Sequence, residues 1–544
     1  MSFLEKHSID SAAPWTEREL FSLALQLGAA DVKGWSPEEK ALAKNAVLID
    51  RKVVAAIRER IRAGEDPLGD LFAELRSPEV RRDLGATYTP APIVRAMLAW
   101  AQEQATPGRV VDPGVGSARF LLDAAACFKK ANLVGIEIDP LAAAMARGNL
   151  AASGLAARSQ IILGDYRDGS LPTTTEKTLF IGNPPYVRHH LIGAKWKAWL
   201  ARKAIELGHE ASQLAGLHVY FFLATALAAR PGDFGALITA AEWLDVNYGK
   251  VVRDLFMGQL GGQGIIVIEP TAAPFPDAAT TAAITFFNIA SKPASVRLRR
   301  VKKLKDLKDL SGGRQVHRER LETESRWSRL TYGARECPSG YVELGELCRV
   351  HRGQVTGANR IWIAGEQTGL PERVLFRSVT KARELISAGK VLDDASQLRF
   401  VVDLPEDIDE FVGAERKAID SFLRNAKKLG THAGYIASHR RAWWSVGLRK
   451  PAPILATYMA RRAPVFTRNL ASARHINIAH GLYPREPLSD ATLGALVDYL
   501  TTGISVIDGR TYAGGLTKFE PGEMERLFVP GPELLKASES AKRQ

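Results

Sequence analysis

The chain has 544 residues, 46% of them hydrophobic, which is more than one hydrophobic core usually organises and predicts at least two large domains. Lysine and arginine number 73 against 60 aspartate and glutamate, and the net charge of +13 favours a polyanionic partner without specifying which one. Three scattered cysteines are too few for a disulfide framework. The chain has no CxxC pair, so the cysteines do not indicate a zinc site. Charged residues interrupt the N-terminal segment, so we expect neither a signal peptide nor a membrane span, and an intracellular, soluble protein.

The N-terminal region is expected to be helical. Ser36, Pro37 and Glu39 have the residue types and the spacing of an N-cap, a first-turn proline and an N3 acid. Apolar positions suited to a buried helix face follow at Leu42, Val47, Leu48 and Val53. We therefore predict a helical N-terminal extension over residues 1–80.

From residue 109 the pattern changes to short apolar, β-branched runs separated by helical stretches. The runs lie at 109–111, 133–138, 161–163, 178–181, 236–239, 265–268 and 283–287. Such alternation predicts an α/β fold in which helices cover both faces of a mostly parallel sheet. We assign this domain to residues 81–290.

The composition changes abruptly after this domain. Residues 291–330 contain thirteen lysines or arginines against five acids, and we predict a basic linker over residues 291–340. Residues 341–535 mix short strands, turns and clustered arginine, histidine and tryptophan without βα regularity. We expect a separate, irregular α+β domain there.

The turn after the first strand is rich in small residues. Asp112 ends the strand and Gly114 and Gly116 follow, which lets backbone amides approach a ligand closely. A nicotinamide-binding loop would place its third glycine where Arg119 stands, so that alternative is disfavoured.

Two further acids follow the next two strands. Glu137 ends the second strand, where an acid can accept hydrogen bonds from both hydroxyls of a ribose. Asp165 ends the third strand beside Tyr166, an acid and an aromatic ring suited to an adenine. Any one of these acids could simply cap a strand end, but three of them in register favour a cradle for a nucleoside.

The fourth strand leads into Asn183, Pro184, Pro185 and Tyr186. The exocyclic amine of adenine is a poor nucleophile because its lone pair is delocalised into the ring. Two acceptors, the Asn183 side-chain oxygen and the Pro184 carbonyl, would draw the nitrogen toward tetrahedral geometry. Consecutive prolines aim that carbonyl rigidly, and Tyr186 offers a face on which a flipped base can stack. The alternative is an ordinary tight turn.

These motifs resemble, in kind and order, the gamma-class, TaqI-like or Eco57I-like adenine-N6 DNA methyltransferases of bacterial restriction–modification systems. The resemblance implies a Rossmann-like class I core that binds S-adenosylmethionine. By this resemblance, the segment Gly85, Ala86, Thr87, Tyr88, Thr89 and Pro90 closes over the methionine end of the cofactor. It also implies cofactor contacts from Asp112, Gly114, Gly116, Glu137, Asp165, Tyr166 and Asn183. Ala118 departs from the family pattern, which has a glycine there.

The same resemblance assigns further catalytic and DNA-reading parts. Phe275, followed by Pro276, is similar to the Phe-Pro step whose ring packs against the flipped adenine, although it could be an ordinary loop aromatic. Residues 352–359 look like the turn that opens the family's target-recognition domain, and residues 510–521 like its closing segment. Arginines near 440, 461, 468 and 474, interleaved with Trp443, Trp444 and Asn469, suit contacts with phosphates and base edges. Surface ion pairs and core tryptophans are the alternative for each of them.

The resulting prediction is a site-specific methyltransferase that acts on adenine N6 in double-stranded DNA of a particular sequence, in the cytoplasm, with any cognate restriction endonuclease acting separately. No metal is needed for direct transfer. Three alternatives stay open: cytosine-N4 methylation, which usually has serine at position 183; methylation of a protein glutamine; and a catalytically impaired DNA-binding relative.

Overall fold

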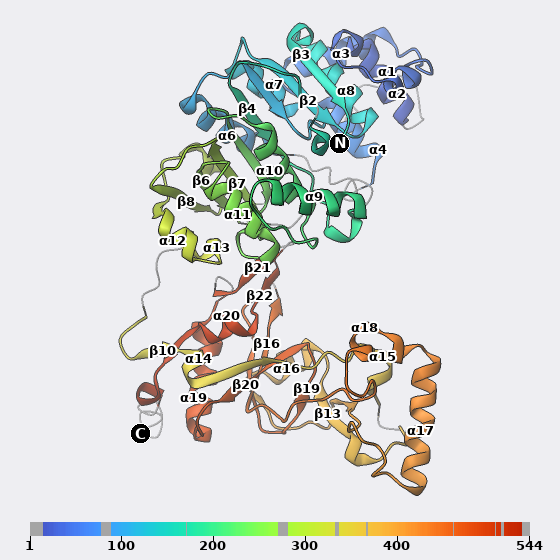
Figure 1. The fold of residues 1–544 in the computed structure, drawn as a ribbon, viewed down its shortest axis with the longest axis vertical. Coiled ribbons are helices and arrows are strands. Elements are labelled where there is room, and N and C mark those ends of the chain that lie inside the picture. Colours follow the sequence, from blue (N-terminus) through green and yellow to red (C-terminus); the bar gives the residue numbers. More distant parts are fainter. Residues whose placement is uncertain are drawn as a thin grey trace. The chain divides into compact units, whose positions relative to one another are not determined.

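The computed structural model describes residues 15–77, 89–169, 171–269, 272, 281–331, 337–365, 368–460, 462–505, 508–512 and 516–535. They form two compact units, one of the described residues up to 331 and one of those from 337 onward (Figure 1). Within these ranges, no helix combines the length and the apolar character needed to cross a membrane.

The first unit begins with four helices: α1 (Glu17–Gln26), α2 (Pro37–Ala43), α3 (Arg51–Arg62) and α4 (Pro67–Leu75). The predicted cap of α2 is confirmed, because the Glu39 N–H donates to Ser36 and the Ser36 N–H donates to Glu39. The helix ends at Ala43, however, so Leu48 lies in the connection to α3 and is 89% exposed. These helices pack against α8 (Pro140–Ala152) through a core of their own.

Nine described strands of the first unit form one sheet, in the order β3-β2-β1-β4-β5-β7-β6-β8-β9. The parallel half contains β3 (Ser159–Leu163), β2 (Asn132–Glu137), β1 (Arg109–Asp112), β4 (Thr178–Gly182) and β5 (Phe234–Ala240). The strand β7 (Ala282–Asn288) runs antiparallel between β5 and β6 (Gly262–Ile268). All seven predicted strands are present, and the order reverses direction at β1 as a doubly wound sheet requires.

The side chains of the buried strands alternate between two hydrophobic cores, one on each face of the sheet, and helices cover both cores. In β4, Phe180 points into one core while Leu179 and Ile181 point into the other, because successive side chains of a strand leave opposite faces. The first core is covered by α9 (Ala194–Glu206), α10 (Leu217–Ala228) and α11 (Lys250–Met257). The second is covered by α6 (Ala91–Gln104), α7 (Arg119–Cys127) and part of α8. The predicted α/β fold with helices on both faces is confirmed.

The basic stretch predicted to be a linker over residues 291–340 is not a linker in its described part. It forms β8 (Ser295–Val301) and β9 (Arg314–His317), which extend the sheet, followed by α12 (Arg318–Thr323) and α13 (Trp327–Leu330). Val296 and Leu298 of β8 are buried, whereas Arg297, which lies between them, and Arg299, which follows Leu298, are partly exposed. The change in composition therefore reflects the polar face of a strand near the sheet edge.

The second unit is a mixed α+β domain. Its largest sheet contains β11 (Cys348–Arg352), β20 (Ala479–Pro484), β16 (Ile454–Thr457), β18 (Phe466–Asn469) and β14 (Val391–Leu392). A second sheet contains β12 (Ile363–Ala364), β15 (Arg399–Val402), β13 (Leu375–Val379) and β19 (Arg474–His475). Smaller sheets pair β10 (Tyr341–Glu343) with β23 (Phe528–Pro530), and join β17 (Met459–Ala460), β22 (Leu516–Lys518) and β21 (Arg510–Tyr512).

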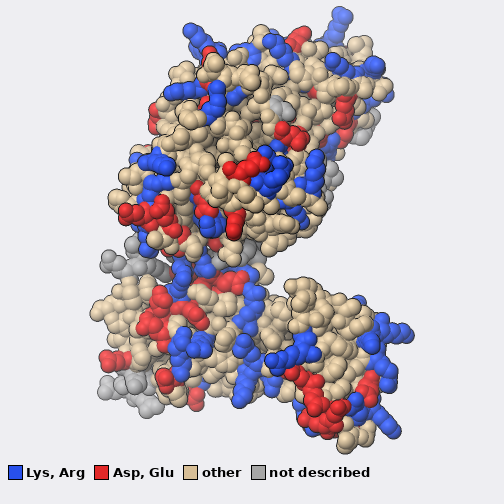
Figure 2. All heavy atoms as spheres, viewed as in Figure 1, with Lys and Arg blue, Asp and Glu red and all other residues tan. Residues whose placement is uncertain are grey.

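The helices of the second unit are mostly short. They are α14 (Leu344–Leu347), α15 (Asn359–Trp362), α16 (Ala382–Ala388), α17 (Gly413–Lys428), α18 (Tyr435–Ser438), α19 (Asp490–Gly503) and α20 (Pro521–Glu525). On the face drawn in Figure 2, basic and acidic side chains are interspersed on each unit. The net charge of +13 is therefore not gathered into one continuous patch on that face.

Candidate active site

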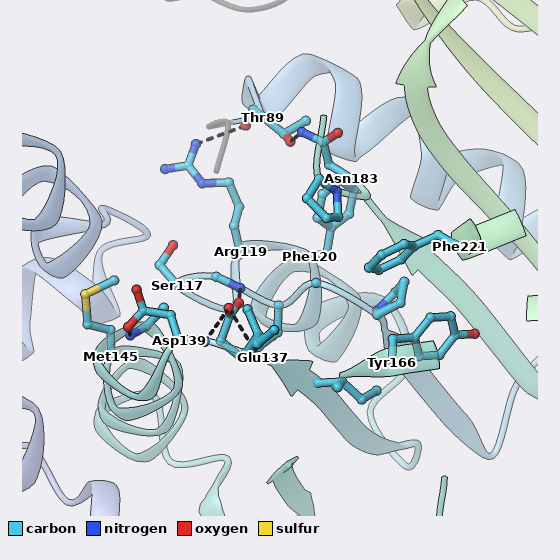
Figure 3. Close-up of a pocket in the computed structure, with 18 of the residues that line it drawn as sticks. Thr89, Ser117, Arg119, Phe120, Glu137, Asp139, Met145, Tyr166, Asn183 and Phe221 are labelled. Atoms are coloured by element: carbon cyan, nitrogen blue, oxygen red, sulfur yellow. Dashed lines mark hydrogen bonds between the residues drawn. The ribbon is translucent and has the colours of Figure 1, made fainter. Parts of the chain in front are cut away.

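A pocket of about 600 Å³ lies where the parallel strands β1 to β4 end. This is the edge at which open α/β sheets bind ligands, and the volume is typical of small-molecule sites. Eight of the predicted site residues line it: Thr89, Gly114, Gly116, Glu137, Asp165, Tyr166, Asn183 and Pro185. Figure 3 labels Thr89, Glu137, Tyr166 and Asn183 among them.

The loop after β1 presents backbone to this pocket. A side chain at Gly116 would meet no atom within 4 Å, so a ligand can approach its main chain closely. Gly116 has φ +50°, and Ala118, two residues later, also adopts a left-handed conformation with φ 68°. The methyl group of Ala118 is fully buried in the core and does not line the pocket. Ala118 therefore introduces backbone strain, but its methyl group does not narrow the space for a ligand.

Glu137 organises the same loop from the end of β2. Its carboxylate accepts hydrogen bonds from the N–H groups of Gly116 at 2.9 Å, Ile138 at 2.9 Å and Asp139 at 3.1 Å. Burial raises the pKa of Glu137, and these three backbone donors act in the opposite direction. The carboxylate thus lies in the pocket wall, next to the loop.

Asp112 does not line the pocket, although it was predicted to contact the cofactor. Its side chain is fully buried, and its Oδ1 accepts from the Gly114 N–H at 3.2 Å. Oδ2 has no hydrogen-bond partner among the described residues. Burial raises the pKa of Asp112 to about 8, which favours the protonated form of this group. A side chain at Gly182 would place its Cβ 2.5 Å from Oδ1, so the end of β4 needs a glycine there.

The end of β3 supplies an acid that is already paired. Asp165 accepts from the Arg167 backbone N–H at 3.0 Å and forms an ion pair with its guanidinium, which lies 3.7 Å over the Trp196 ring. Tyr166 is 4% exposed and its hydroxyl is bonded to Thr225 at 3.0 Å. Its ring packs against Phe221 at 5.4 Å, and both rings reach the pocket (Figure 3).

Asn183 directly follows β4 and lines the pocket. Its side-chain Nδ2 donates to the hydroxyl of Thr89 at 3.0 Å, which directs the amide oxygen away from Thr89. Arg119 in turn donates to the Thr89 carbonyl at 3.4 Å. Thr89, Arg119 and Asn183 thus tie the segment before α6 to the loops after β1 and β4.

The remaining predicted residues lie beside the pocket or outside the described chain. Pro90 caps α6, Pro184 is buried, and neither lines the pocket. The hydroxyl of Tyr186 is buried, and this burial raises the pKa of Tyr186 well above its ordinary value. Tyr88 and Phe275 lie outside the described residues.

Several residues of the pocket wall were not predicted. Phe221 and Leu217 come from α10, and Asp70, Phe72 and Ala73 come from α4 in the N-terminal region. Arg119 also lines the pocket; it lies inside the predicted loop motif, but no contact with a ligand was predicted for its side chain. Nothing local in the sequence marks the α4 residues, because only the packing of α4 on α8 brings them to the pocket.

In the second unit, several side chains of the predicted DNA-reading segment have structural partners. Arg440 donates to the carbonyls of Val355 and Thr356, and the Trp444 indole donates to the Pro405 carbonyl. Arg468 and Asn469 of β18 are both 7% exposed. Arg441, by contrast, has a side chain that is 87% exposed. Arg461 lies outside the described residues.

The residues of the pocket fit S-adenosylmethionine. Open space around Gly116 accommodates a ligand beside the main chain, carboxylates stand at the ends of β2 and β3, and aromatic rings line the side next to β3. With this strand order, the fold and the site define a class I S-adenosylmethionine-dependent methyltransferase.

Comparison with known proteins refines this class. Residues 66–205 match the family described as N-6 DNA Methylase, and residues 334–544 match the family described as Type II methyltransferase M.Eco57I, C-terminal domain. The chain is 52% identical over 533 residues to Type II methyltransferase M.XamI from Xanthomonas campestris pv. amaranthicola, covering 96% of this chain and 99% of the relative.

Two more distant relatives show how far the similarity extends. Type II methyltransferase M.AccI from Acinetobacter calcoaceticus is 23% identical over 482 residues, 84% of this chain and 87% of that protein. A release factor glutamine methyltransferase from Bordetella pertussis is 34% identical over 95 residues, only 18% of this chain and 34% of that protein. The chain belongs to the gamma-class adenine-N6 DNA methyltransferases of restriction–modification systems, whose cofactor is S-adenosylmethionine.

Proposed function

We propose that this protein is the site-specific modification methyltransferase of a restriction–modification system, and that it methylates N6 of an adenine flipped out of duplex DNA. The observation that carries the proposal is the position of Asn183, at the end of β4, in the wall of the cofactor pocket and bonded to Thr89. In this position the Asn183 amide can contact the amino group of a target base that approaches the methyl group of the bound cofactor.

The bound cofactor supplies an electrophilic methyl group on its sulfonium. In our proposal, Asn183 Oδ1 and the Pro184 carbonyl accept the two hydrogens of the adenine amine and direct its lone pair toward that methyl group. The hydrogen bond from Asn183 Nδ2 to Thr89 supports this role, because it fixes the orientation of the amide and places its donor end on Thr89. Preorganised acceptors of this kind need no rearrangement during the reaction.

The same proposal gives the other predicted residues their roles. Tyr186 and Phe275 are the aromatic walls for the flipped base, whose stacking offsets part of the cost of leaving the duplex. Glu137 binds the ribose and Asp165 the adenine of the cofactor, while Thr89 and the loop at Gly114 and Gly116 hold its methionine end. The product nitrogen then loses its proton to water, so no metal or covalent intermediate is required.

The partner proposed for the second unit is duplex DNA of one recognition sequence. The similarity to a Type II methyltransferase extends over both units, which supports a DNA substrate over the glutamine alternative. A cognate endonuclease acting on the same sequence as a separate protein completes the proposed system.

Asn183→Ala tests the proposal. We expect kcat for methyl transfer into DNA to fall by about 100-fold or more, since removal of one preorganised polar contact has effects of that order. Binding of S-adenosylmethionine, measured by calorimetry, should weaken far less than turnover falls, because Asn183 is only one of the residues that line the cofactor pocket. Asn288→Ala is the matched control, because Asn288 bonds to Gln104 at the far end of β7. Near-normal turnover by Asn183→Ala would contradict the mechanism.

A further inference from the structure

Asp66 joins the N-terminal helices to the cofactor loop. It is the N-cap of α4, is only 8% exposed, and accepts from the Gly69 N–H at 3.0 Å. The same carboxylate accepts from the Asn149 side chain of α8 at 3.2 Å and from the Ser117 hydroxyl at 2.5 Å. One buried side chain thus contacts α4, α8 and the loop after β1.

Ser117 is the residue of that loop whose neighbours on both sides have left-handed backbone conformations. It lies between Gly116, with φ +50°, and Ala118, with φ 68°. A left-handed alanine costs free energy, so contacts around it have to offset a tendency to relax. Ser117 is fixed at two points: its hydroxyl by Asp66, and its carbonyl by the Asn149 Nδ2 at 2.9 Å.

This turn forms part of the wall of the cofactor pocket. The Gly116 N–H, one residue earlier, donates to Glu137, and Gly116 and Ser117 both line the pocket. On the other side of Asp66, Gly69, Asp70 and Phe72 of α4 line it as well. A second link joins the same regions, because Arg76, just after α4, pairs with Asp139 in the pocket wall.

We propose that Asp66 is a positioning residue for cofactor binding. It holds the Gly116–Ser117 turn in the conformation that receives the methionine end of S-adenosylmethionine, and it thereby makes the N-terminal helices a wall of the cofactor site. The proposal rests on the assignment of the cofactor but does not depend on which base is methylated.

The test compares Asp66→Ala with Asp50→Ala in the full-length chain. Asp50 is an exposed N-cap of α3 in the same helical region, bonded to the Lys52 N–H, so its replacement removes a similar cap away from the pocket. We expect Asp66→Ala to weaken S-adenosylmethionine binding, measured by calorimetry without DNA, by about tenfold or more. The Michaelis constant for the cofactor should rise in parallel, while kcat at saturating cofactor and the Michaelis constant for DNA stay within about twofold. Asp50→Ala should change none of these.

A second variant, Asp66→Asn, keeps an oxygen that can accept from the Gly69 N–H and so preserves the cap of α4. It tests the proposal if Asp66→Ala does not fold. A folded Asp66→Asn protein, verified by circular dichroism, should lose at least about threefold in cofactor affinity, because one acceptor of the shared carboxylate is lost. Cofactor affinity in the folded Asp66 variants equal to that of Asp50→Ala would overturn the proposal. So would a fall in kcat with unchanged cofactor affinity. Neither outcome bears on the Asn183 test, which measures methyl transfer to DNA.

Discussion

The two units use their polar side chains in different ways. In the first unit, Glu137, Asp165 and Asn183 stand at the same edge of one sheet, at the ends of the parallel strands β2, β3 and β4, and line one pocket. In the second unit, many polar groups of the arginine- and tryptophan-rich stretch serve the fold itself, as Arg440 and Arg468 do by bonding to backbone carbonyls. Residue type combined with a strand end therefore predicts a site, whereas composition alone does not distinguish a surface from an interior.

The largest effect expected from this comparison concerns Glu137. Glu137→Ala removes the acid proposed for the ribose and the acceptor of the Gly116 N–H. Hydrogen bonds to a charged group contribute about 1.5 to 3 kcal/mol, so we expect cofactor affinity to fall by about 10- to 100-fold. Calorimetry with S-adenosylmethionine measures this. Glu206→Ala is the control, because Glu206 forms surface ion pairs with Arg202 and Lys203 of its own helix, α9, and does not line the pocket. An equal effect of both variants would refute the assignment.

A second prediction uses the buried acid at the end of β1. The pKa of Asp112 is raised to about 8 in the folded protein, so between about pH 4 and pH 8 the unfolded chain gives up this proton while the folded protein keeps it. The free energy of unfolding therefore decreases as pH rises through that window, by up to about 1.4 kcal/mol per pH unit, and levels off above it. Asp112→Asn should remove this slope in urea unfolding of the cofactor-free protein. Identical pH profiles for both proteins would contradict the raised pKa.

A smaller effect separates two arginines of the second unit. Arg468→Ala should lower the free energy of unfolding by about 1 to 2 kcal/mol, because the partly buried Pro453 carbonyl loses its charged donor at 2.8 Å and keeps only the Asn469 N–H at 3.0 Å. Its ion pair with Asp490, which is 91% exposed, adds little. Arg441→Ala should change stability by less than about 0.5 kcal/mol. Thermal unfolding of both variants checks this, and a greater loss for Arg441→Ala would reverse our assignment of interior and surface roles.

The sheet and much of the pocket were predictable because their signals are local. Each strand is a short buried run, and the motif residues follow the strand ends directly. The α2 cap is equally local, at Ser36 and Glu39. The one large error in the first unit, the linker at 291–340, arose because β8 alternates arginines with buried apolar residues and its composition resembles a linker.

The rest of the fold and of the site depends on contacts between distant segments. Glu39 caps α2 and also pairs with Arg147 of α8, both fully buried, which no local pattern indicates. Asp66 has the ordinary features of an N-cap in the sequence, and only the packing of α4 on α8 brings it to Ser117. Phe221 belongs to an almost wholly apolar helix, so nothing distinguishes it from its neighbours before the fold is known.

The central claim is that this chain places a methyl group on N6 of adenine in duplex DNA. The most direct measurement is nucleoside mass spectrometry of duplex DNA treated with the purified protein and isotopically labelled S-adenosylmethionine, followed by sequencing that maps the modified base. The account predicts labelled N6-methyladenine at one recognition sequence, and none with Asn183→Ala. Labelled N4-methylcytosine, or label found only in protein, would contradict it.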